Sequence, residues 1–318
     1  MTKIGVLSNP LSRNNLKHLG ELQKFLGEHR DVLHLQLTDF NSLPSVLRDF
    51  AEQAVDILVV NGGDGTVSAV LTELFEHRAF PEPPLLAVLP GGTSNTIAGD
   101  VGLRGDPLRS LERLFEEVAS GTYANSMATR GLIRVHYDAT KSAVVGMFFG
   151  TAAICDAIVL RRRIFPQQWL PDSIAGALTL IYVLANIIAG RGGKVLSSQP
   201  IGIDVDQGKS AVSRYSLVMV TTLRRVFLGS SPFWGGGDRA LKITSVRSPT
   251  TGLALHAYRL LYGRDKHKLP GATYQSANGD RIELQMACPF NLDGEFFQPS
   301  TDSSVTLTGP YTARFVQC

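Results

Sequence analysis

Short apolar runs alternate with helix-like segments through the first 125 residues, and this alternation limits the folds that the chain can adopt. The run Ile57-Leu58-Val59-Val60 is rich in β-branched residues, which is typical of a strand buried on both faces. From residue 67 to residue 77 the apolar residues recur at helical spacing instead. Strands in regular alternation with helices predict a parallel, doubly wound sheet. The predicted strands are 3–8, 32–37, 56–60 and 85–89, and the predicted helices are 15–28, 43–54, 67–77 and 108–119.

After about residue 125 the pattern changes to strands separated by turn residues. Several of these strands alternate polar and apolar residues, which predicts a mostly antiparallel β-rich domain, typically a sandwich. The predicted strands are 132–137, 143–149, 201–205, 215–221, 241–246, 272–276 and 282–286, with helices near 155–190 and 250–262. A length of 318 residues suits two domains of roughly 150 residues each. We therefore predict an α/β plus β protein with domains 1–125 and 126–318, and with room for the last residues to return to the first domain.

Composition excludes several classes of protein. A net charge of +3 is too small to indicate nucleic-acid binding, and no nucleic-acid-binding motif is present. Three widely separated cysteines predict neither a zinc site nor a disulfide framework, which favours a cytoplasmic setting. The apolar run after Lys3 is too short for a signal peptide. Residues 174–190 are uncharged but shorter than the roughly 20 residues of a spanning helix, so we expect a buried helix there.

Three glycines surround one carboxylate at a predicted strand-to-helix turn, Gly62-Gly63-Asp64-Gly65-Thr66. Glycine lets backbone N–H groups approach an anion closely, and the start of a helix favours negative charge. In open α/β sheets, ligands bind at the carboxyl ends of the strands. The segment therefore predicts a phosphate-binding loop. A tight turn with Asp64 as a helix cap is the alternative.

Three further segments follow predicted strands and would share this edge of the sheet. They are Asn9-Pro10-Leu11-Ser12-Arg13, Thr38 and Gly91-Gly92-Thr93-Ser94-Asn95. Each supplies small residues, hydroxyls or amides, which are suitable donors for the phosphates and sugar of a nucleotide. Four such segments at equivalent strand ends favour a nucleotide site over four ordinary loops.

The motifs together resemble the diacylglycerol kinase catalytic family, which includes bacterial lipid kinases and the sphingosine and ceramide kinases. NPLSR is similar to the NPxSG segment of that family, NGGDGT to its GGDGT signature and LPGGTSNTIAGDVGL to its LPxGTxNDFAR segment. The late NLDGE resembles its DGE. GGDGT alone is shared with NAD kinases and phosphofructokinase-like enzymes, so the combination is the more specific signal. The resemblance covers nearly the whole chain.

The resemblance implies an ATP-dependent lipid kinase that uses Mg²⁺ and phosphorylates a diacylglycerol-like or sphingoid lipid in a cleft between the domains. The catalytic candidates are Asp293, Glu295 and Asp64. A strand through Asp293-Gly294-Glu295 would aim both of its carboxylates at the same side, whereas a hairpin turn would leave them solvated. The implied nucleotide-binding residues are Asn9, Pro10, Ser12, Arg13, Thr38, Gly62, Gly63, Asp64, Gly65, Thr66, Gly92, Thr93 and Asn95.

Three positions depart from the family pattern. Arg13 stands where the family often has glycine, and Thr96 replaces the usual aspartate after the asparagine. In residues 232–241, which resemble a family segment that helps to hold a structural magnesium ion, only Asp238 remains among the expected ligands. One carboxylate beside an arginine is a poor site for a hard cation, so Asp238 is a weak metal candidate.

A basic and apolar segment, residues 160–170, contains Arg161, Arg162 and Arg163 among large apolar residues. This composition suits peripheral contact with anionic headgroups at the inner face of a membrane, although a solvated turn fits equally well. Arg224-Arg225 is a similar pair. An NAD kinase and a catalytically silent lipid-binding or regulatory module remain the alternatives to a lipid kinase. The sequence does not indicate an oligomeric state.

Overall fold

The computed structural model describes residues 2–92, 94–165, 177–179, 181–182, 185–186, 197–208, 211–250, 252–263, 265–300 and 304–317. Thr93, residues 166–170 and most of the 174–190 stretch lie outside these residues. The chain divides into two compact units. Unit 1 comprises Met1–Leu132, Val144–Gly146 and Tyr311–Cys318, and unit 2 comprises Ile133–Ala143 and Met147–Pro310.

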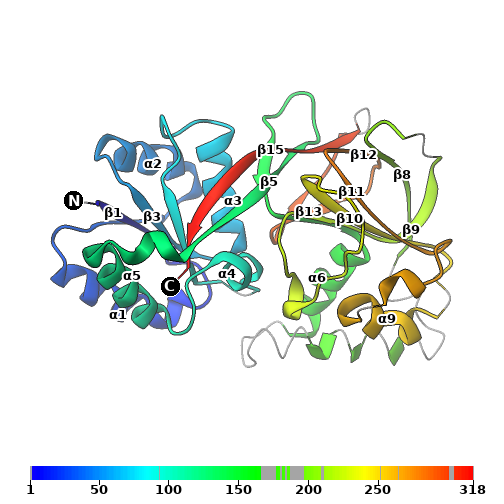
Figure 1. Cartoon of the computed structure of the whole chain (residues 1–318), viewed down its shortest axis with the longest axis horizontal. Coiled ribbons are helices and arrows are strands. Elements are labelled where there is room, and N and C mark those ends of the chain that lie inside the picture. Colours follow the sequence, from blue (N-terminus) through cyan, green and yellow to red (C-terminus); the bar gives the residue numbers. More distant parts are fainter. Residues whose placement is uncertain are drawn as a thin grey trace. The chain divides into compact units, whose positions relative to one another are not determined.

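Unit 1 is built on a parallel sheet with the strand order β15-β4-β3-β1-β2, as the sequence pattern predicts. Figure 1 shows α1 and α5 on one side of these strands and α2 on the other. Its elements are β1 (Ile4–Ser8), α1 (Asn15–Glu28), β2 (Leu33–Gln36), η1 (Phe40–Ser42), α2 (Leu43–Glu52), β3 (Ile57–Gly62), α3 (Asp64–Phe75), β4 (Leu85–Pro90), α4 (Thr96–Val101), α5 (Pro107–Ser120), η2 (Thr122–Ser126), the first part of β5 (Met127–His136), β6 (Val144–Gly146) and the last part of β15 (Val305–Val316).

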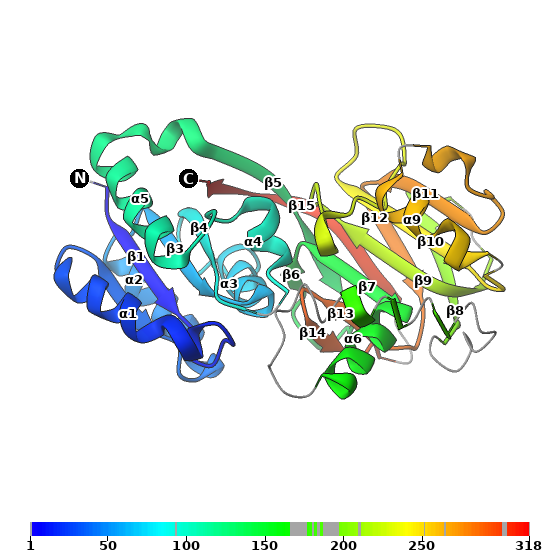
Figure 2. The ribbon, with the colours of Figure 1, turned by 90° about the horizontal axis from the view of Figure 1, so that it is seen from below.

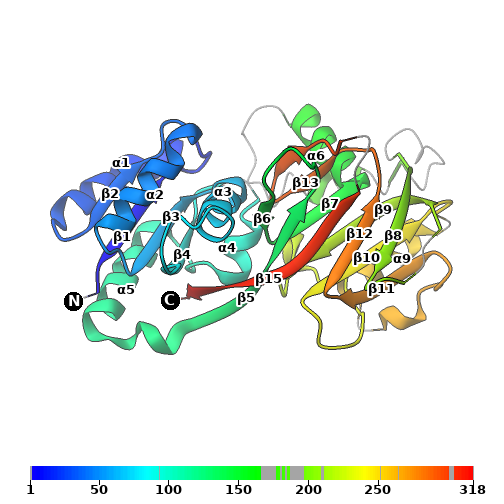
Figure 3. The same ribbon diagram turned by 90° about the horizontal axis from the view of Figure 1, so that it is seen from above.

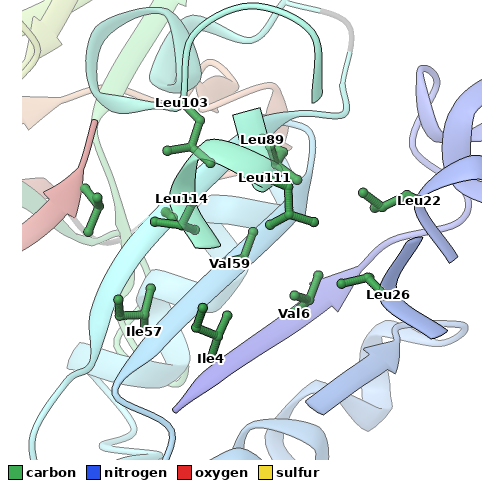
Figure 4. Close-up of a cluster of buried hydrophobic side chains, with 12 residues drawn as sticks. Ile4, Val6, Leu22, Leu26, Ile57, Val59, Leu89, Leu103, Leu111 and Leu114 are labelled. Atoms are coloured by element: carbon green, nitrogen blue, oxygen red, sulfur yellow. The ribbon is translucent and has the colours of Figure 1, made fainter. Parts of the chain in front are cut away.

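The core of unit 1 forms because successive strand residues point to opposite faces of the sheet. On one face, alternate residues of β1 and β3 meet α1 and α5. Figure 4 shows this cluster, which includes Ile4, Val6, Leu22, Leu26, Ile57, Val59, Leu89, Leu103, Leu111 and Leu114. On the other face, a Cβ on Gly5 would lie 2.7 Å from the ring of Phe50, so β1 and α2 pack too closely there for a side chain.

The ends of α5 follow from local sequence signals. Asp106 accepts hydrogen bonds from the N–H groups of Leu108 and Arg109, and Pro107 occupies the first turn. Gly121 ends the helix at φ 73°, a conformation that glycine adopts without strain.

Unit 2 is a mostly antiparallel β-structure, so the predicted α/β plus β class is confirmed. Figures 2 and 3 show its strands from opposite sides. The elements are the remainder of β5, β7 (Phe148–Ala152), α6 (Ala153–Ile164), β8 (Gln199–Val205), β9 (Ser213–Thr221), η3 (Phe227–Gly229), β10 (Leu241–Arg247), α9 (Leu253–Tyr262), η4 (Lys266–Lys268), β11 (Tyr274–Gly279), β12 (Arg281–Gln285), β13 (Phe290–Leu292), β14 (Glu295–Phe297) and the first part of β15.

Strand β8 joins the two layers of unit 2. Its first residues, 199–201, pair with β9, and residues 202–205 pair with β12. A strand that changes partners in this way connects packed sheets at a corner. Among the described residues, no helix is both long enough and apolar enough to cross a membrane.

A buried ion pair fixes α4 in unit 1. Arg130 Nε lies 2.8 Å from Asp100 Oδ2, and the two side chains are only 7% and 5% exposed. Gln317 donates a further hydrogen bond to the carbonyl oxygen of Asp100. The pair therefore ties α4 to β5 and to the end of the chain.

Removing one partner of this pair should be costly, because the other charge stays buried without compensation. We expect Arg130→Ala to lower the free energy of unfolding by about 3–5 kcal/mol. Arg239→Ala is the matched control, because the Arg239–Asp280 pair is 55% and 52% exposed, and exposed pairs contribute only about 0–1 kcal/mol. Urea unfolding of both variants measures the difference. Equal losses would contradict a structural role for the Arg130–Asp100 pair.

Candidate functional site

Three loops meet at the carboxyl ends of the parallel strands in unit 1. Ser8, at the end of β1, is in register with Asn61 of β3, and Gly62 is in register with Pro90 at the end of β4. The segments that follow these strands therefore lie side by side. They are the predicted loops 9–13, 62–66 and 91–95.

Glycines allow the second and third loops to touch backbone to backbone. A Cβ added to Gly92 would lie 2.2 Å from Cα of Gly63, and one added to Gly91 would lie 2.8 Å from the backbone nitrogen of Gly62. Real Cβ atoms do not approach backbone atoms this closely, so side chains are excluded at both positions. The glycines are thus required by loop-to-loop contact, whether or not a ligand is bound.

Asn9 and Thr66 fasten the first loop to the start of α3. Asn9 Nδ2 donates to Thr66 Oγ1 at 2.9 Å, and its Oδ1 accepts from the N–H of Leu11 at 2.9 Å. Both residues are buried, 5% and 4% exposed. Ser12 Oγ accepts a hydrogen bond from the N–H of Gly63 at 3.3 Å. These predicted binding residues therefore also hold the loops together.

Two neighbouring asparagines that the motif analysis missed contribute to the same network. Asn14 Nδ2 donates to the carbonyl oxygen of Pro90, and Asn15 Nδ2 donates to the carbonyl oxygens of Asn9 and Asn61. Asn15 is 5% exposed. The available signal was two consecutive amides just after the first loop, at the start of a helix.

Asp64 connects α3 to α4. Its two carboxylate oxygens accept hydrogen bonds from the N–H groups of Thr96 at 2.9 Å and Ile97 at 3.0 Å. Asp64 thus caps the N-terminus of α4, while it also lies in the first turn of α3. Burial raises the pKa of this carboxyl group, and the hydrogen bonds from Thr96 and Ile97 oppose that rise.

The remaining predicted binding residues occupy varied positions. Asn95 has a left-handed backbone (φ 47°) and closes its own loop, with Oδ1 accepting from the N–H of Gly92 and Nδ2 donating to its carbonyl oxygen. Thr38 is exposed, and Pro10 and Arg13 are half-buried. The predicted Thr93 lies outside the described residues.

The N-terminus of α3 is open to an anion. The N-cap residue, Gly63, offers no side-chain cap, and the N–H of Val67 is the first to bond back to the carbonyl oxygen of Gly63. The preceding N–H groups of a helix lack partners within it, and the helix dipole favours negative charge beside them. This arrangement can bind a phosphate group.

The expected strand through Asp293-Gly294-Glu295 is wrong, because Asp293 and Gly294 form the turn of a hairpin between β13 and β14, and Glu295 begins β14. Asp293 has φ 49° and Gly294 has φ 98°, as in the two-residue turns that Asp-Gly sequences favour. Asp293 is 4% exposed, whereas Glu295 is exposed. The two carboxylates therefore do not share one face of a strand.

Asp293 is held by backbone groups far away in the sequence. Its Oδ2 accepts from the N–H of Met147 at 2.8 Å and its Oδ1 from the N–H of Phe148 at 2.9 Å. Its own N–H donates to the carbonyl oxygen of Phe148. The carboxylate thus fixes the hairpin to the start of β7.

The hairpin also contacts the basic part of α6. Arg162 Nη2 donates to the carbonyl oxygen of Gly294 at 3.4 Å, and its guanidinium lies 5.4 Å from the ring centre of Phe296. One of the three arginines predicted to contact lipid therefore packs on the DGE turn.

The metal candidate gains no further ligands. Asp238 is exposed, and among the described residues no group of three or more His, Cys, Asp or Glu side chains gathers in a way that could hold a metal ion.

A cavity of about 520 Å³ in unit 1 lies at the amino-terminal ends of the parallel strands, away from the glycine loops. It is lined by Thr2, Val55, Asp56, Glu82, Pro83, Pro84, Leu85, Tyr123 and Arg314.

The glycine-rich loops of unit 1 lie at the carboxyl ends of its parallel strands, where open α/β sheets bind their ligands. Residues 3–123 match the family model of the diacylglycerol kinase catalytic domain. This match confirms, for the first 123 residues, the resemblance to the diacylglycerol kinase catalytic family that was inferred from the motifs.

Two curated proteins are similar to part of the chain. One is a "Probable lipid kinase YegS-like" of Enterobacter sp. (strain 638), 29% identical over 107 residues, which are 32% of this chain and 34% of that protein. The other is a "Diacylglycerol kinase" of Bacillus subtilis (strain 168), 28% identical over 123 residues, 37% of this chain and 40% of that protein. The matched parts thus span between a third and two fifths of the relatives' own lengths.

Solved structures share the fold over almost the whole chain. A putative diacylglycerol kinase of Bacillus anthracis str. Sterne has a TM-score of 0.65 at 17% identity, covering 99% of this chain and 97% of that one. Another from the same organism has a TM-score of 0.64 at 16% identity, with 99% and 94% coverage. At these identities the likeness concerns the fold alone.

The contact between the glycine loops gives a direct test. We expect Gly92→Ala to force the loops apart, which should destabilise the protein by about 1–3 kcal/mol and lower any phosphate-transfer rate by the order of 10²-fold. Gly99→Ala in α4 is the control, since a Cβ there meets nothing within 4 Å. Thermal unfolding and the rate of transfer from labelled ATP compare the two variants. A Gly92→Ala protein that matched the control in both would refute the close contact.

Proposed function

We propose that the protein is an ATP-dependent lipid kinase that transfers the γ-phosphate of ATP to a hydroxyl group of a diacylglycerol-like or sphingoid lipid. The observation that carries this proposal is the open N-terminus of α3, framed by interlocked glycine loops, within a diacylglycerol kinase catalytic domain. Phosphoryl transfer needs a cradle for the phosphates, charge neutralisation and a positioned base.

The phosphates of ATP would lie on the N–H groups of the α3 start, at Asp64, Gly65 and Thr66. The hydroxyl of Ser12 is 3.3 Å from the nitrogen of Gly63 and adds a polar group at the same edge. The exposed Thr38 follows β2 and suits a contact with a more distant part of the nucleotide.

The residues at this edge are compatible with Mg²⁺. A carboxylate has about four lone-pair sites, and Asp64 accepts two backbone hydrogen bonds, from Thr96 and Ile97, and one from the side chain of Thr96. Asp64 therefore keeps the capacity to accept from metal-bound water. When bound, Mg²⁺ would neutralise negative charge on the β- and γ-phosphate oxygens. Phosphate oxygens and water, more than protein side chains, usually hold such an ion.

Of the three candidate carboxylates, we propose Glu295 as the base. The carboxylates of Asp64 and Asp293 are both engaged by backbone N–H groups. The side chain of Glu295 is exposed, and its carboxylate forms no hydrogen bond with the described part of the chain. We assign Glu295 to accept the proton of the lipid hydroxyl, and Asp293 to position the hairpin that carries it.

In the proposed reaction, the lipid oxygen forms a bond to the γ-phosphorus as the bond from that phosphorus to the β,γ-bridging oxygen breaks. The proton of the hydroxyl passes to Glu295, and ADP leaves with the electron pair of the broken bond. A carboxylate can perform this transfer when it lies within hydrogen-bond reach of the hydroxyl.

The assignment predicts different results for two conservative substitutions. Glu295→Gln should lower turnover by about 10²–10⁴-fold without loss of stability, because it removes a base from an exposed position. Asp293→Asn should lower turnover, because it loosens the hairpin that carries Glu295. Unlike Glu295→Gln, it should lower the free energy of unfolding as well, by about 1–3 kcal/mol, because a buried N–H group loses its acceptor. Turnover with labelled ATP and urea unfolding separate these effects. Full turnover by Glu295→Gln would exclude it as the base.

The proposal as a whole is tested by incubating the parent protein with labelled ATP, Mg²⁺ and a panel of hydroxylated lipids. A phosphorylated lipid product is expected. NADP formed from NAD, with no lipid product, would identify an NAD kinase. Lipid binding without transfer to any lipid of the panel would identify a silent lipid-binding module.

A further inference from the structure

Helix α9 of unit 2 exposes large apolar side chains along one face. Leu255, Tyr258 and Tyr262 are 81%, 76% and 43% exposed, and their spacing of three and four residues places them on the same side of the helix. The opposite side is buried through Ala257 and Leu260. Figure 1 shows α9 at the outside of unit 2.

A second element extends this face. Tyr262 Oη donates to the carbonyl oxygen of Leu228 at 3.2 Å, which places η3 beside the end of α9. Phe227 of η3 is 40% exposed. We call the side chains of Phe227, Leu255, Tyr258 and Tyr262 the α9 surface. Large contiguous apolar groups in water usually mark a contact with a partner or a membrane.

Exposed arginines flank the α9 surface in sequence. Arg224 and Arg225 precede η3, and the exposed Asp265 that follows α9 is already paired with Lys268 at 3.0 Å. Arg224, Arg225 and Arg259 are exposed, and Arg259 lies in the last turn of α9. The α9 surface therefore lies in a basic region that complements an anionic partner.

The residue types distinguish between anionic partners. Aliphatic and aromatic side chains on one face of a helix with arginine nearby are typical of helices that lie in the interface of a bilayer. Single-stranded nucleic acid is bound by stacking on aromatic rings, and Leu255, the most exposed of the four side chains, has no ring to offer.

We infer that the α9 surface binds the headgroup region of an anionic lipid bilayer. The apolar side chains enter the boundary between headgroups and acyl chains, while the neighbouring arginines attract anionic headgroups. The inference deepens the proposed function, because a kinase with a lipid acceptor must reach that acceptor at a membrane. It also assigns membrane contact to residues other than Arg161, Arg162 and Arg163.

Vesicle sedimentation tests the apolar part. With vesicles of phosphatidylcholine containing roughly 30% phosphatidylglycerol, the parent should bind, and Leu255→Ser/Tyr258→Ser should bind at least about tenfold more weakly, since two side chains lose their burial. Leu16→Ser on α1 is the matched control, because Leu16 is 63% exposed in unit 1. Equal binding by the double variant and the control would overturn the inference.

The same assay tests the electrostatic part. Arg225→Glu/Arg259→Glu should weaken binding by roughly tenfold or more, whereas Arg48→Glu on the exposed face of α2 should leave it nearly unchanged. Binding should also fall as salt rises and on pure phosphatidylcholine vesicles. Binding that ignored salt and headgroup charge would overturn the inference. A second result would also overturn it. The parent would form a dimer or a complex with single-stranded DNA, and the Leu255→Ser/Tyr258→Ser variant would lose that association but still bind vesicles.

A transfer assay separates this inference from the proposed kinase activity. On a short-chain acceptor dispersed as monomers, Leu255→Ser/Tyr258→Ser should retain the turnover of the parent, and on vesicles its turnover should fall with its binding. If the parent transferred no phosphate to either substrate while the vesicle results held, the kinase proposal would fail and the membrane surface would stand. Unchanged thermal unfolding of the variant confirms that it is folded.

Discussion

The structure of the candidate site depends on the contact between the backbones at Gly63 and Gly92. With no side chain between them, the loops after β3 and β4 come close enough for the carboxylate of Asp64 to reach the first N–H groups of α4. Asn9, Asn14 and Asn15 then fasten the loop after β1 to the same assembly. The result is a rigid rim around the open N-terminus of α3, which is a suitable place for a phosphate group.

Three carboxylates from the GGDGT and DGE motifs occupy three different environments. Burial raises the pKa of Asp64, which links two helices. Asp293 is buried and saturates two backbone N–H groups. Glu295 alone of the three is exposed. These environments favour Glu295 for the proposed proton transfer, whereas Asp64 and Asp293 are engaged with backbone N–H groups. Residue type alone could not separate the three.

The sequence predicted those parts of the fold that depend on local periodicity. The strand expected at 56–60 is β3, Ile57–Gly62. The helix expected at 67–77 is α3, which begins earlier, at Asp64, because the glycine turn is shorter than the pattern suggested. The residue pattern indicated the hairpin at Asp293-Gly294 only as the alternative to a strand, although Asp-Gly between apolar residues is a turn signal. The partners of Asp293 lie 146 and 145 residues away, and no local pattern encodes such contacts. The face of α9 was likewise missed, because exposure depends on tertiary packing.

We propose that the rim of unit 1 binds the phosphates of ATP. Amide hydrogen exchange with and without a non-hydrolysable ATP analogue and Mg²⁺ measures this directly. We expect slower exchange at residues 62–67 and 91–97, with little change at the strand starts around the 520 Å³ cavity near Asp56 and Leu85. Protection centred on Asp56 and Leu85, with the glycine loops unaffected, would contradict it.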